Sequence, residues 1–343
     1  MGRERFTCSD FSTRDRPPKR SAIYRYCAKR RKNYRRGTRD KTQGAIKIMQ
    51  ETKSEIKIAF WGTSRISVIV LEEMAREGML PSLIVTAPPR QKGRGLEMSP
   101  SEVKVWADAH NVPALEPEKL DSEFCFQLST LDFGLFVIAS YGKIVPRNIL
   151  DLPKHGTLNV HPSLLPKLRG ASPIQSAILE EVPVGEPHDA GVTIMLIDEE
   201  VDHGPIVAQQ KITVPNWPPK GTDLEEMLGI LGGKLLVETI PLWVSGKITP
   251  EEQEHDHATF TKKMTSGSGQ IYLDDDSARM FRKIRAFDSW PRAYFTTTRN
   301  NLEIRVVVTE AHLEDGKLVL DRVIPEGKKE MSYEDFMRGQ RGS

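Results

Sequence analysis

The stretch IKIAFWGTSRISVIVLEEMAREG, residues 56–78, decides the fold that the sequence predicts. Its first seven residues form a short apolar run ending in glycine, which is typical of a strand buried in a parallel sheet. Residues 66–78 are amphipathic, and Gly78 is a typical residue at the end of a helix. A buried strand followed at once by a helix is the repeating unit of an α/β fold.

The same alternation continues to about residue 240. Further strands are predicted at 83–87, 133–140, 155–161, 191–197 and 206–214. Further helices are predicted at 101–111, 119–131, 171–181 and 222–240, the last opened by a capping box of Thr222 and Glu225. This order predicts an open, mostly parallel, Rossmann-like sheet. The first turn, WGTSRIS, lacks the glycine patterns of NAD and ATP sites, so a small ligand is expected at the carboxyl ends of the strands.

Beyond the predicted sheet the pattern changes. A helix at 277–287 precedes YFTTT, LEIRVVVTEAHL and KLVLDRVIP, which read as strands joined by short turns. They predict a small β-rich unit, for which a partly open five-stranded, OB-like barrel would fit. We therefore expect four parts: a basic extension at 1–54, a catalytic domain at 55–246, a polar linker at 247–260 and an OB-like domain at 261–343.

The basic extension carries most of the positive charge. Residues 1–48 hold 16 Lys or Arg and 4 Asp or Glu, whereas the rest of the chain holds 33 and 43, so the two parts carry +12 and −10. The block has three readings: a phosphate-seeking arm whose tyrosines stack on bases, a disordered tail without a task, or sequence upstream of a true start at Met49. The sequence leaves all three open.

The rest of the composition fits a cytoplasmic protein. No apolar run is long enough for a membrane span, and no apolar segment near the N-terminus resembles a secretory signal. Cys8, Cys27 and Cys125 are too few and too scattered for a disulfide framework or a zinc cluster. We expect a protein of a reducing compartment.

Polar residues that could carry chemistry lie where predicted strands end. In LNVHPSLLPKLRG, residues 158–170, Asn159 and His161 are two residues apart, so both side chains leave the strand on one face. The loop DEEVDHGP, residues 198–205, contributes Asp202. If the sheet is parallel here, both loops reach the edge to which the strand at 133–140 also leads.

Such a set suits acyl transfer to an amine. A neutral imidazole can accept the proton that the amine loses, the Asn159 amide could stabilise the oxyanion, and Asp202 could orient His161. The alternatives are a structural Asn-x-His pair and an acidic loop that is only solvated. His188, Asp189, Asp202 and His203 lack the spacing of a metal site, so no metal is expected.

The run NVHPSLLPKLRGASPIQSAI, followed by GVTIMLIDEEVDHGPIVAQ, closely resembles the folate-dependent formyltransferases. The resemblance implies an Asn, His and Asp site for 10-formyltetrahydrofolate and places these roles on Asn159, His161 and Asp202. It implies that the folate lies against the loops that carry Lys143, Ile144, Val145, Ser163, Leu164, Leu165, Pro166, Ile197, Asp198 and Val201.

Three further stretches resemble the branch of this family that formylates methionyl-tRNA. PPRQKGRGLEMSPSEVK, residues 88–104, is similar to its tRNA-contacting loop, and IRAFDSWPRAYF and PEGKKEMSYEDFMRG are similar to its C-terminal domain. The resemblance implies a monomer that formylates initiator methionyl-tRNA for translation initiation. The tRNA contacts that we expect are Arg90, Lys92, Arg94, Arg169, Lys283 and Arg285, with Arg94 entering the acceptor stem.

Three rival functions are compatible with parts of the sequence. An amino-sugar nucleotide formyltransferase shares the core chemistry, and a formyltetrahydrofolate hydrolase replaces the amine with water. A non-catalytic RNA-binding protein could use the basic block and the β unit alone. The loop at 88–104 and the segment IRAFDSWP disfavour the first, and the intact Asn, His and Asp set disfavours the last.

Overall fold

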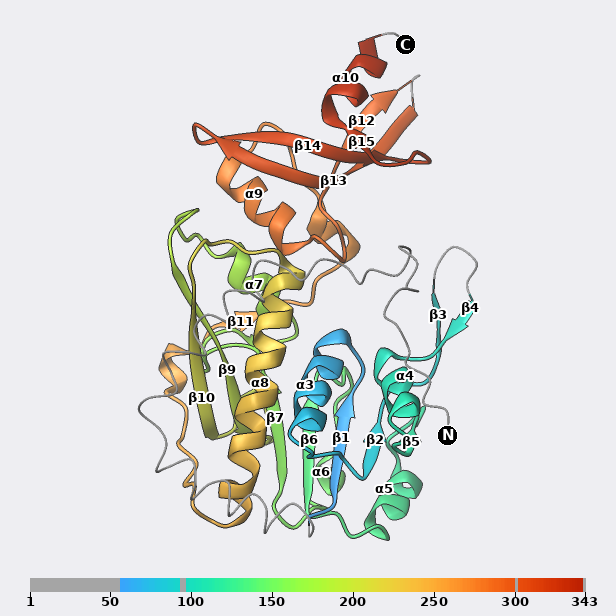
Figure 1. The fold of residues 1–343 in the computed structure, drawn as a ribbon, viewed down its shortest axis with the longest axis vertical. Helices are drawn as coiled ribbons and strands as arrows, with labels where there is room; N and C mark the ends of the chain where they lie inside the picture. The colour runs from blue at the N-terminus through green and yellow to red at the C-terminus, as the bar shows by residue number, and fades with distance from the viewer. Residues whose placement is uncertain (1–55, 93–96, 300–301, 342–343) are drawn as a thin grey trace, which may run out of the picture. The chain divides into compact units, whose positions relative to one another are not determined.

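A seven-stranded sheet forms the centre of the fold, in the order β10-β9-β7-β6-β1-β2-β5 (Figure 1). The computed structural model describes residues 56–92, 97–299 and 302–341, so the basic extension lies outside the described residues. The strands are β1 (Ile58–Gly62), β2 (Leu83–Val85), β5 (Ala114–Leu115), β6 (Leu135–Ala139), β7 (Thr157–His161), β9 (His188–Leu196) and β10 (Ile206–Val214). Every residue of β1 and β6 is buried, as their apolar runs predicted.

The direction of the strands divides the sheet into two parts. β5, β2, β1, β6 and β7 are parallel, which confirms the predicted Rossmann-like core. β9 runs antiparallel to β7, and β10 runs antiparallel to β9. The sheet is therefore not parallel where the sequence analysis supposed, and the carboxyl end of β9 lies beside the start of β7. The apolar pattern of β9 marks a buried strand but carries no information about its direction.

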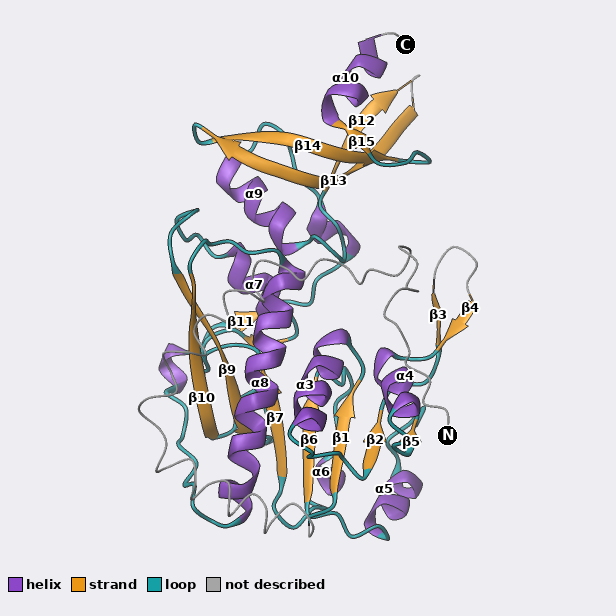
Figure 2. Ribbon diagram, in the orientation of Figure 1, coloured by secondary structure: helices purple, strands orange, loops and turns teal. Residues whose placement is uncertain are grey.

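Helices α3 (Arg65–Arg76) and α8 (Gly221–Val244) pack against each other over one face of this sheet (Figure 2). The other helices of this part are α4 (Glu102–Ala109), α5 (Ser122–Ser129), α6 (Arg147–Leu150) and α7 (Pro173–Leu179). α7 carries Pro173 in its first turn, as predicted.

The predicted capping box at the start of α8 is wrong. The helix begins at Gly221, and its N-cap residue, Lys220, makes no side-chain cap. The carboxylate of Asp288 instead accepts hydrogen bonds from the backbone N–H of Thr222, at 3.1 Å, and from its hydroxyl. A residue far along the chain thus satisfies the helix terminus, which local sequence could not reveal.

Small residues let α8 approach its neighbours closely. A Cβ on Gly232 would lie 2.8 Å from Val160 on β7 and 3.2 Å from Val192 on β9. A Cβ on Gly233 would lie 2.6 Å from the Glu73 Cβ and 3.1 Å from the Val70 carbonyl oxygen on α3. Because Gly232 and Gly233 have no side chains, α8 can lie close to α3 and to β7, the strand that carries Asn159 and His161.

Among the described residues, α8 is also the one helix long and apolar enough to cross a membrane by length and composition. Half of its most apolar window is buried inside the protein, and it contacts α3, β7, β9 and β10. Its apolar character is accounted for by these contacts, as in the core helix of a globular domain.

The C-terminal β unit has a core of its own. It contains the antiparallel sheet β12-β13-β14-β15, made of β12 (Tyr294–Arg299), β13 (Leu302–Glu314), β14 (Lys317–Pro325) and β15 (Met331–Ser332). Helices α9 (Ser277–Ala286) and α10 (Tyr333–Arg341) flank it. Residues from these elements, among them Phe295, Val306 and Phe336, form one apolar cluster. The described sheet has four strands where a five-stranded barrel was expected, and an isolated parallel bridge joins Gln270 to Tyr294 on its edge strand β12.

Two short strand pairs stand outside these sheets. β3 (Arg90–Lys92) and β4 (Glu97–Ser99) form an antiparallel hairpin within the predicted tRNA loop. β8 (Arg169–Gly170) pairs in parallel with β11 (Phe260–Thr261). The second pair joins the segment after α8, where a linker was predicted, to the end of the stretch 158–170 that contains Asn159 and His161. The division of the chain into domains stays a prediction.

Replacement of Gly233 by alanine tests the close packing of α8. In a solvent-exposed helix this change stabilises by roughly 1 kcal/mol. Here we expect Gly233→Ala to lower the free energy of unfolding by about 1–3 kcal/mol, because the new methyl group would meet the α3 backbone. Urea unfolding measures the change, with Lys234→Ala at the adjacent exposed position as control. A Gly233→Ala protein as stable as the Lys234→Ala protein would contradict the packing described.

Candidate active site

Asn159 and His161 lie on β7 and point to the same side of the strand, as their spacing predicted. In the pairing with β9, Asn159 is opposite Met195 and His161 is opposite Thr193. His161 is 4% exposed, whereas Asn159 is only partly buried. The imidazole is therefore held in place by the protein, and the amide of Asn159 is the more accessible of the two groups.

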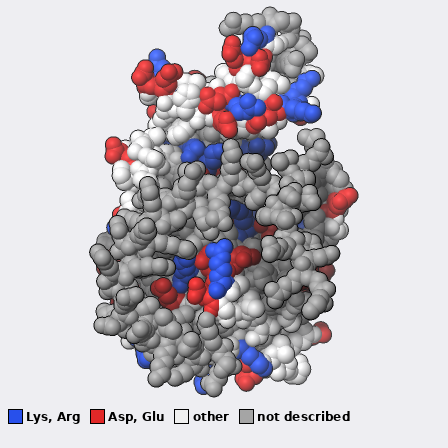
Figure 3. All heavy atoms as spheres, in the orientation of Figure 1, with Lys and Arg blue, Asp and Glu red and all other residues white. Residues whose placement is uncertain are grey.

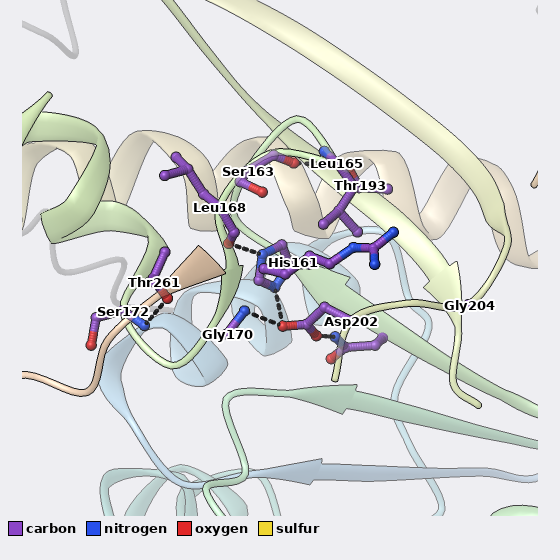
Figure 4. Close-up of polar contacts among 12 residues, drawn as sticks. His161, Ser163, Leu165, Leu168, Gly170, Ser172, Thr193, Asp202, Gly204 and Thr261 are labelled. Atoms are coloured by element: carbon purple, nitrogen blue, oxygen red, sulfur yellow. Dashed lines mark hydrogen bonds and ion pairs between the residues drawn. The ribbon is translucent and has the colours of Figure 1, made fainter. Parts of the chain in front are cut away.

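The loop between β9 and β10 brings Asp202 to both side chains (Figure 4). One carboxylate oxygen, Oδ1, accepts a hydrogen bond from Asn159 Nδ2 at 3.3 Å. The other, Oδ2, accepts one from the Gly170 N–H at 2.7 Å and lies 3.5 Å from His161 Nδ1. Asn159, His161 and Gly170, which lie in one short stretch of the chain, thus meet at the Asp202 carboxylate, although β9 runs in the opposite direction from that supposed.

The hydrogen bonds of His161 identify the nitrogen that can exchange a proton. Its Nε2 lies 3.0 Å from the carbonyl oxygen of Leu168, which can only accept, so Nε2 carries a hydrogen. Nδ1 then has the free lone pair. Its distance of 3.5 Å from Asp202 is longer than an ordinary N–H···O bond of about 2.7–3.2 Å. Nδ1 can therefore take up a proton, and the carboxylate would stabilise the charged ring.

A buried hydroxyl fixes the turn that follows His161. Thr193 Oγ1 donates to the Ser163 carbonyl at 2.7 Å and accepts from the Leu165 N–H at 3.1 Å. Gln209 Nε2 donates to the same hydroxyl at 2.9 Å and to the Leu165 carbonyl at 3.0 Å. The sequence analysis missed Thr193 and Gln209. The available signal for Thr193 was a polar residue in an otherwise apolar strand, the same signal that drew attention to Asn159.

Residues 251–261, which include most of the predicted linker, pack against the site. Gln253 donates to the carbonyl oxygens of Asp202 and Gly204, at 2.9 and 2.7 Å. Thr259 accepts a hydrogen bond from the Leu168 N–H through its hydroxyl, at 2.8 Å. The sequence analysis missed both residues, because polar residues in a polar stretch give no sign that they are packed.

Arg169 lies inside the protein, contrary to its expected place on a tRNA-binding surface. Its side chain is 3% exposed and donates to Gln253 Oε1 from Nε at 3.1 Å and from a terminal nitrogen at 2.6 Å. The same terminal nitrogen lies 2.9 Å from His255 Nδ1. A buried guanidinium that is bound to Gln253 does not reach a phosphate. In this structure Arg169 binds Gln253, which in turn binds the backbone of Asp202.

The residues expected to contact folate differ in how exposed they are to solvent. Ile144 and Val201, from the loops after β6 and β9, are exposed to solvent. Val145 and Ile197 pack on the core, and Asp198 binds His203 Nδ1 at 2.6 Å. Among the turn residues, Ser163 and Leu165 are buried, while the Leu164 side chain packs over Gly191 and the Pro166 carbonyl accepts from the Thr259 N–H.

Lys143 and Tyr141 begin the loop after β6. Burial, together with the nearby charge of Arg90, lowers the pKa of Lys143, whose ammonium donates to the carbonyl oxygens of Pro117 and Glu118. Burial raises the pKa of Tyr141 to about 12, so this phenol stays neutral while its ring packs 5.3 Å from that of Trp61. Both contacts hold the start of the loop and leave Ile144 at its exposed tip.

The residues expected to contact tRNA also differ in whether their charged groups are free or bound within the protein. Arg90 is exposed on the β3–β4 hairpin, and Arg94 lies outside the described residues, as does the side chain of Lys92. Lys283 donates to the Gln270 carbonyl, and Arg285 to the Pro218 carbonyl, so both side chains are used within the protein. Of the described candidates, Arg90 is the one whose charged group faces solvent. Across the described ranges, no group of three or more His, Cys, Asp or Glu residues could hold a metal ion.

Comparison with known proteins identifies a family that matches this geometry. The family model described as formyl transferase matches residues 56–240. A methionyl-tRNA formyltransferase of Geobacillus sp. (strain WCH70) is 35% identical over 306 residues, which span 83% of this chain and 94% of the relative. One from Thermodesulfovibrio yellowstonii is 34% identical over 302 residues, covering 83% and 96%.

Solved structures share the fold at lower identity. The methionyl-tRNA formyltransferase of Clostridium thermocellum aligns with a TM-score of 0.53 and 16% identity, over 79% of this chain and 98% of its own. HypX of Aquifex aeolicus, in complex with tetrahydrofolic acid, aligns with a TM-score of 0.56 and 14% identity, over 83% and 47%. On the family match and the relatives at about 35% identity, this chain belongs to the formyl transferase family, in its methionyl-tRNA formyltransferase branch.

Proposed function

We propose that this protein transfers the formyl group of 10-formyltetrahydrofolate to the α-amine of methionine on initiator methionyl-tRNA. The observation that carries the proposal is the meeting of Asn159, His161 and Asp202 at one partly open site, with distances of 3.3 and 3.5 Å to the shared carboxylate. The relatives named as methionyl-tRNA formyltransferases, similar over 83% of the chain, support the choice of acceptor. We extend the proposal to a monomer that acts in the cytoplasm.

Asn159 is suited to bind the formyl oxygen. Its amide group has two N–H donors, and one of them is used by Asp202 at a long 3.3 Å. The second remains for the formyl oxygen, on which negative charge develops as the amine attacks. A donor already fixed by Asp202 needs no reorganisation at that moment, so it favours the transition state over the ground state.

His161 and Asp202 are suited to move the proton. The new bond joins the methionine nitrogen to the formyl carbon, and the bond that breaks is the one from that carbon to N10 of the folate. The attacking amine must lose a proton, and N10 must gain one as it leaves. Nδ1 of His161 can hold this proton between the two events, because Asp202 lies 3.5 Å away and the Leu168 carbonyl fixes the other nitrogen.

The loops around this cluster fit a folate donor. The exposed apolar residues Ile144 and Val201 offer surface to the flat pterin ring. The folate supplies an activated formyl group, and no nucleophilic side chain is needed for its transfer. Direct attack by the amine therefore agrees with the residues that the cluster contains.

The β3–β4 hairpin is the best-supported tRNA contact. The charge of Arg90 helps to lower the pKa of Lys143, so the hairpin and the loop after β6 lie within electrostatic reach of each other. On the face shown in Figure 3, the visible described Lys and Arg side chains are interspersed with Asp and Glu. The basic residues of the hairpin would guide the acceptor end toward His161.

Replacement of His161 by alanine tests the chemistry. We expect His161→Ala to fold and to lower kcat by about 100-fold or more, because no other group at Asp202 can hold the transferred proton. The measurement is steady-state formylation of initiator methionyl-tRNA with 10-formyltetrahydrofolate. His312→Ala, which removes an exposed imidazole from β13, is the control. A kcat for His161→Ala within about twofold of the control would overturn the assignment of His161.

Neutralising the hairpin tests the tRNA contact. We expect the triple variant of Arg90, Lys92 and Arg94 to alanine to raise KM for tRNA by about tenfold, with KM for folate little changed. The salt dependence of the tRNA KM should also flatten, because fewer phosphate contacts release counterions. A variant with Lys119, Lys154 and Lys247 changed to alanine removes the same charge from other exposed sites. Equal effects in both variants would show that only net charge matters.

A further inference from the structure

Gln253 occupies a central position behind the catalytic carboxylate. It is 4% exposed and uses all four of its hydrogen-bonding positions. Its two amide hydrogens go to the Asp202 carbonyl at 2.9 Å and the Gly204 carbonyl at 2.7 Å. Its oxygen accepts from two nitrogens of Arg169, at 3.1 and 2.6 Å. The side chain therefore ties the backbone of the Asp202 loop to a buried guanidinium.

The orientation of this amide is fixed by chemistry. A guanidinium can only donate, so the Gln253 oxygen must face Arg169. Backbone carbonyls can only accept, so the amide nitrogen must face Asp202 and Gly204. Reversing the amide would place donor against donor and acceptor against acceptor. Arg169 thus determines which end of Gln253 meets the catalytic loop.

The loop that Gln253 holds has an unfavourable backbone conformation. Asp202 has a φ of +49°, in the left-handed region that non-glycine residues rarely adopt. A Cβ on Gly204 would lie 2.1 Å from the Leu196 carbonyl oxygen, so the chain is also pressed against β9. Such a conformation persists only where surrounding contacts enforce it. Within the described residues, the hydrogen bonds from Gln253 to both sides of His203 are such contacts.

We propose that Gln253 is a positioning residue for the transfer reaction, oriented by Arg169, and that it acts by holding the Asp202 carboxylate against Asn159 and His161. Gln253 follows the segment, residues 56–240, that matches the formyl transferase family model. A residue after the catalytic core would then complete the catalytic geometry. The proposal rests on the proposed formyl transfer for its kinetic consequence, but its structural part stands independently.

The sharpest variant is Gln253→Glu. It keeps the side chain's size and an acceptor for Arg169, but replaces the amide donor by an oxygen facing two carbonyl oxygens. We expect kcat to fall by about 10- to 100-fold, as small displacements of reacting groups do, with KM for tRNA little changed. Gln210→Glu, an exposed position on β10, controls for the added charge. A kcat equal to that of this control would overturn the proposal.

A double variant separates positioning from a general effect on structure. In an Asp202→Asn background, Gln253→Glu should lower kcat by less than about threefold further, because the group that it positions is already lost. An undiminished effect would overturn the proposal. If Gln253→Glu does not fold, Arg169→Lys is measured in both backgrounds, and the same dependence on Asp202 is expected.

A readout without activity distinguishes failure of this inference from failure of the proposed function. Backbone amides of residues 198–204 should exchange hydrogen for deuterium at least about tenfold faster in Gln253→Glu than in Gln210→Glu. Wild-type protein without formyl transfer would refute the proposed function while leaving this comparison valid. Unchanged exchange in an active enzyme would refute the positioning role alone.

Discussion

The shared carboxylate of Asp202 is the interaction on which the site depends. One of its oxygens binds the Asn159 amide, and the other binds the Gly170 N–H and faces His161. A single carboxylate thus contacts both the Asn159 amide and the His161 imidazole. Because removing a carboxylate from water is costly unless it is paired, the partly buried Asp202 depends on the Gly170 N–H and the Asn159 amide as much as they depend on it.

The antiparallel pairing of β7 with β9 makes this arrangement possible. Because β9 runs against β7, its carboxyl end lies at the start of β7, beside Thr157. The loop that follows must return along the face of β7 to reach Asn159 and His161. A loop that leaves its strand in this way needs support from elsewhere, and Gln253, which Arg169 orients, supplies hydrogen bonds to its backbone. The segment after α8 therefore holds the Asp202 loop in place through Gln253.

The sequence predicted features that depend on local pattern. The positions of β1 and β6 followed from apolar runs, and β10 has the bounds that its strand pattern predicted. The placement of Asn159 and His161 on one face of β7 followed from the two-residue repeat of a strand. Features that depend on distant residues were not predictable. The direction of β9, the cap that Asp288 gives α8 and the burial of Arg169 each arise from tertiary contacts. The resemblance gave Arg169 a place among the tRNA contacts, and its burial behind Gln253 depends on residues far along the chain.

The most direct test of the account is formyl transfer from 10-formyltetrahydrofolate to methionyl initiator tRNA, compared with methionyl elongator tRNA, by the full chain and by residues 49–343. The account predicts rapid transfer to the initiator by both proteins and little transfer to the elongator. Absence of transfer to either tRNA by both proteins would contradict it. Activity on an amino-sugar nucleotide, or hydrolysis of the donor, would then be measured as the remaining uses of the same catalytic cluster.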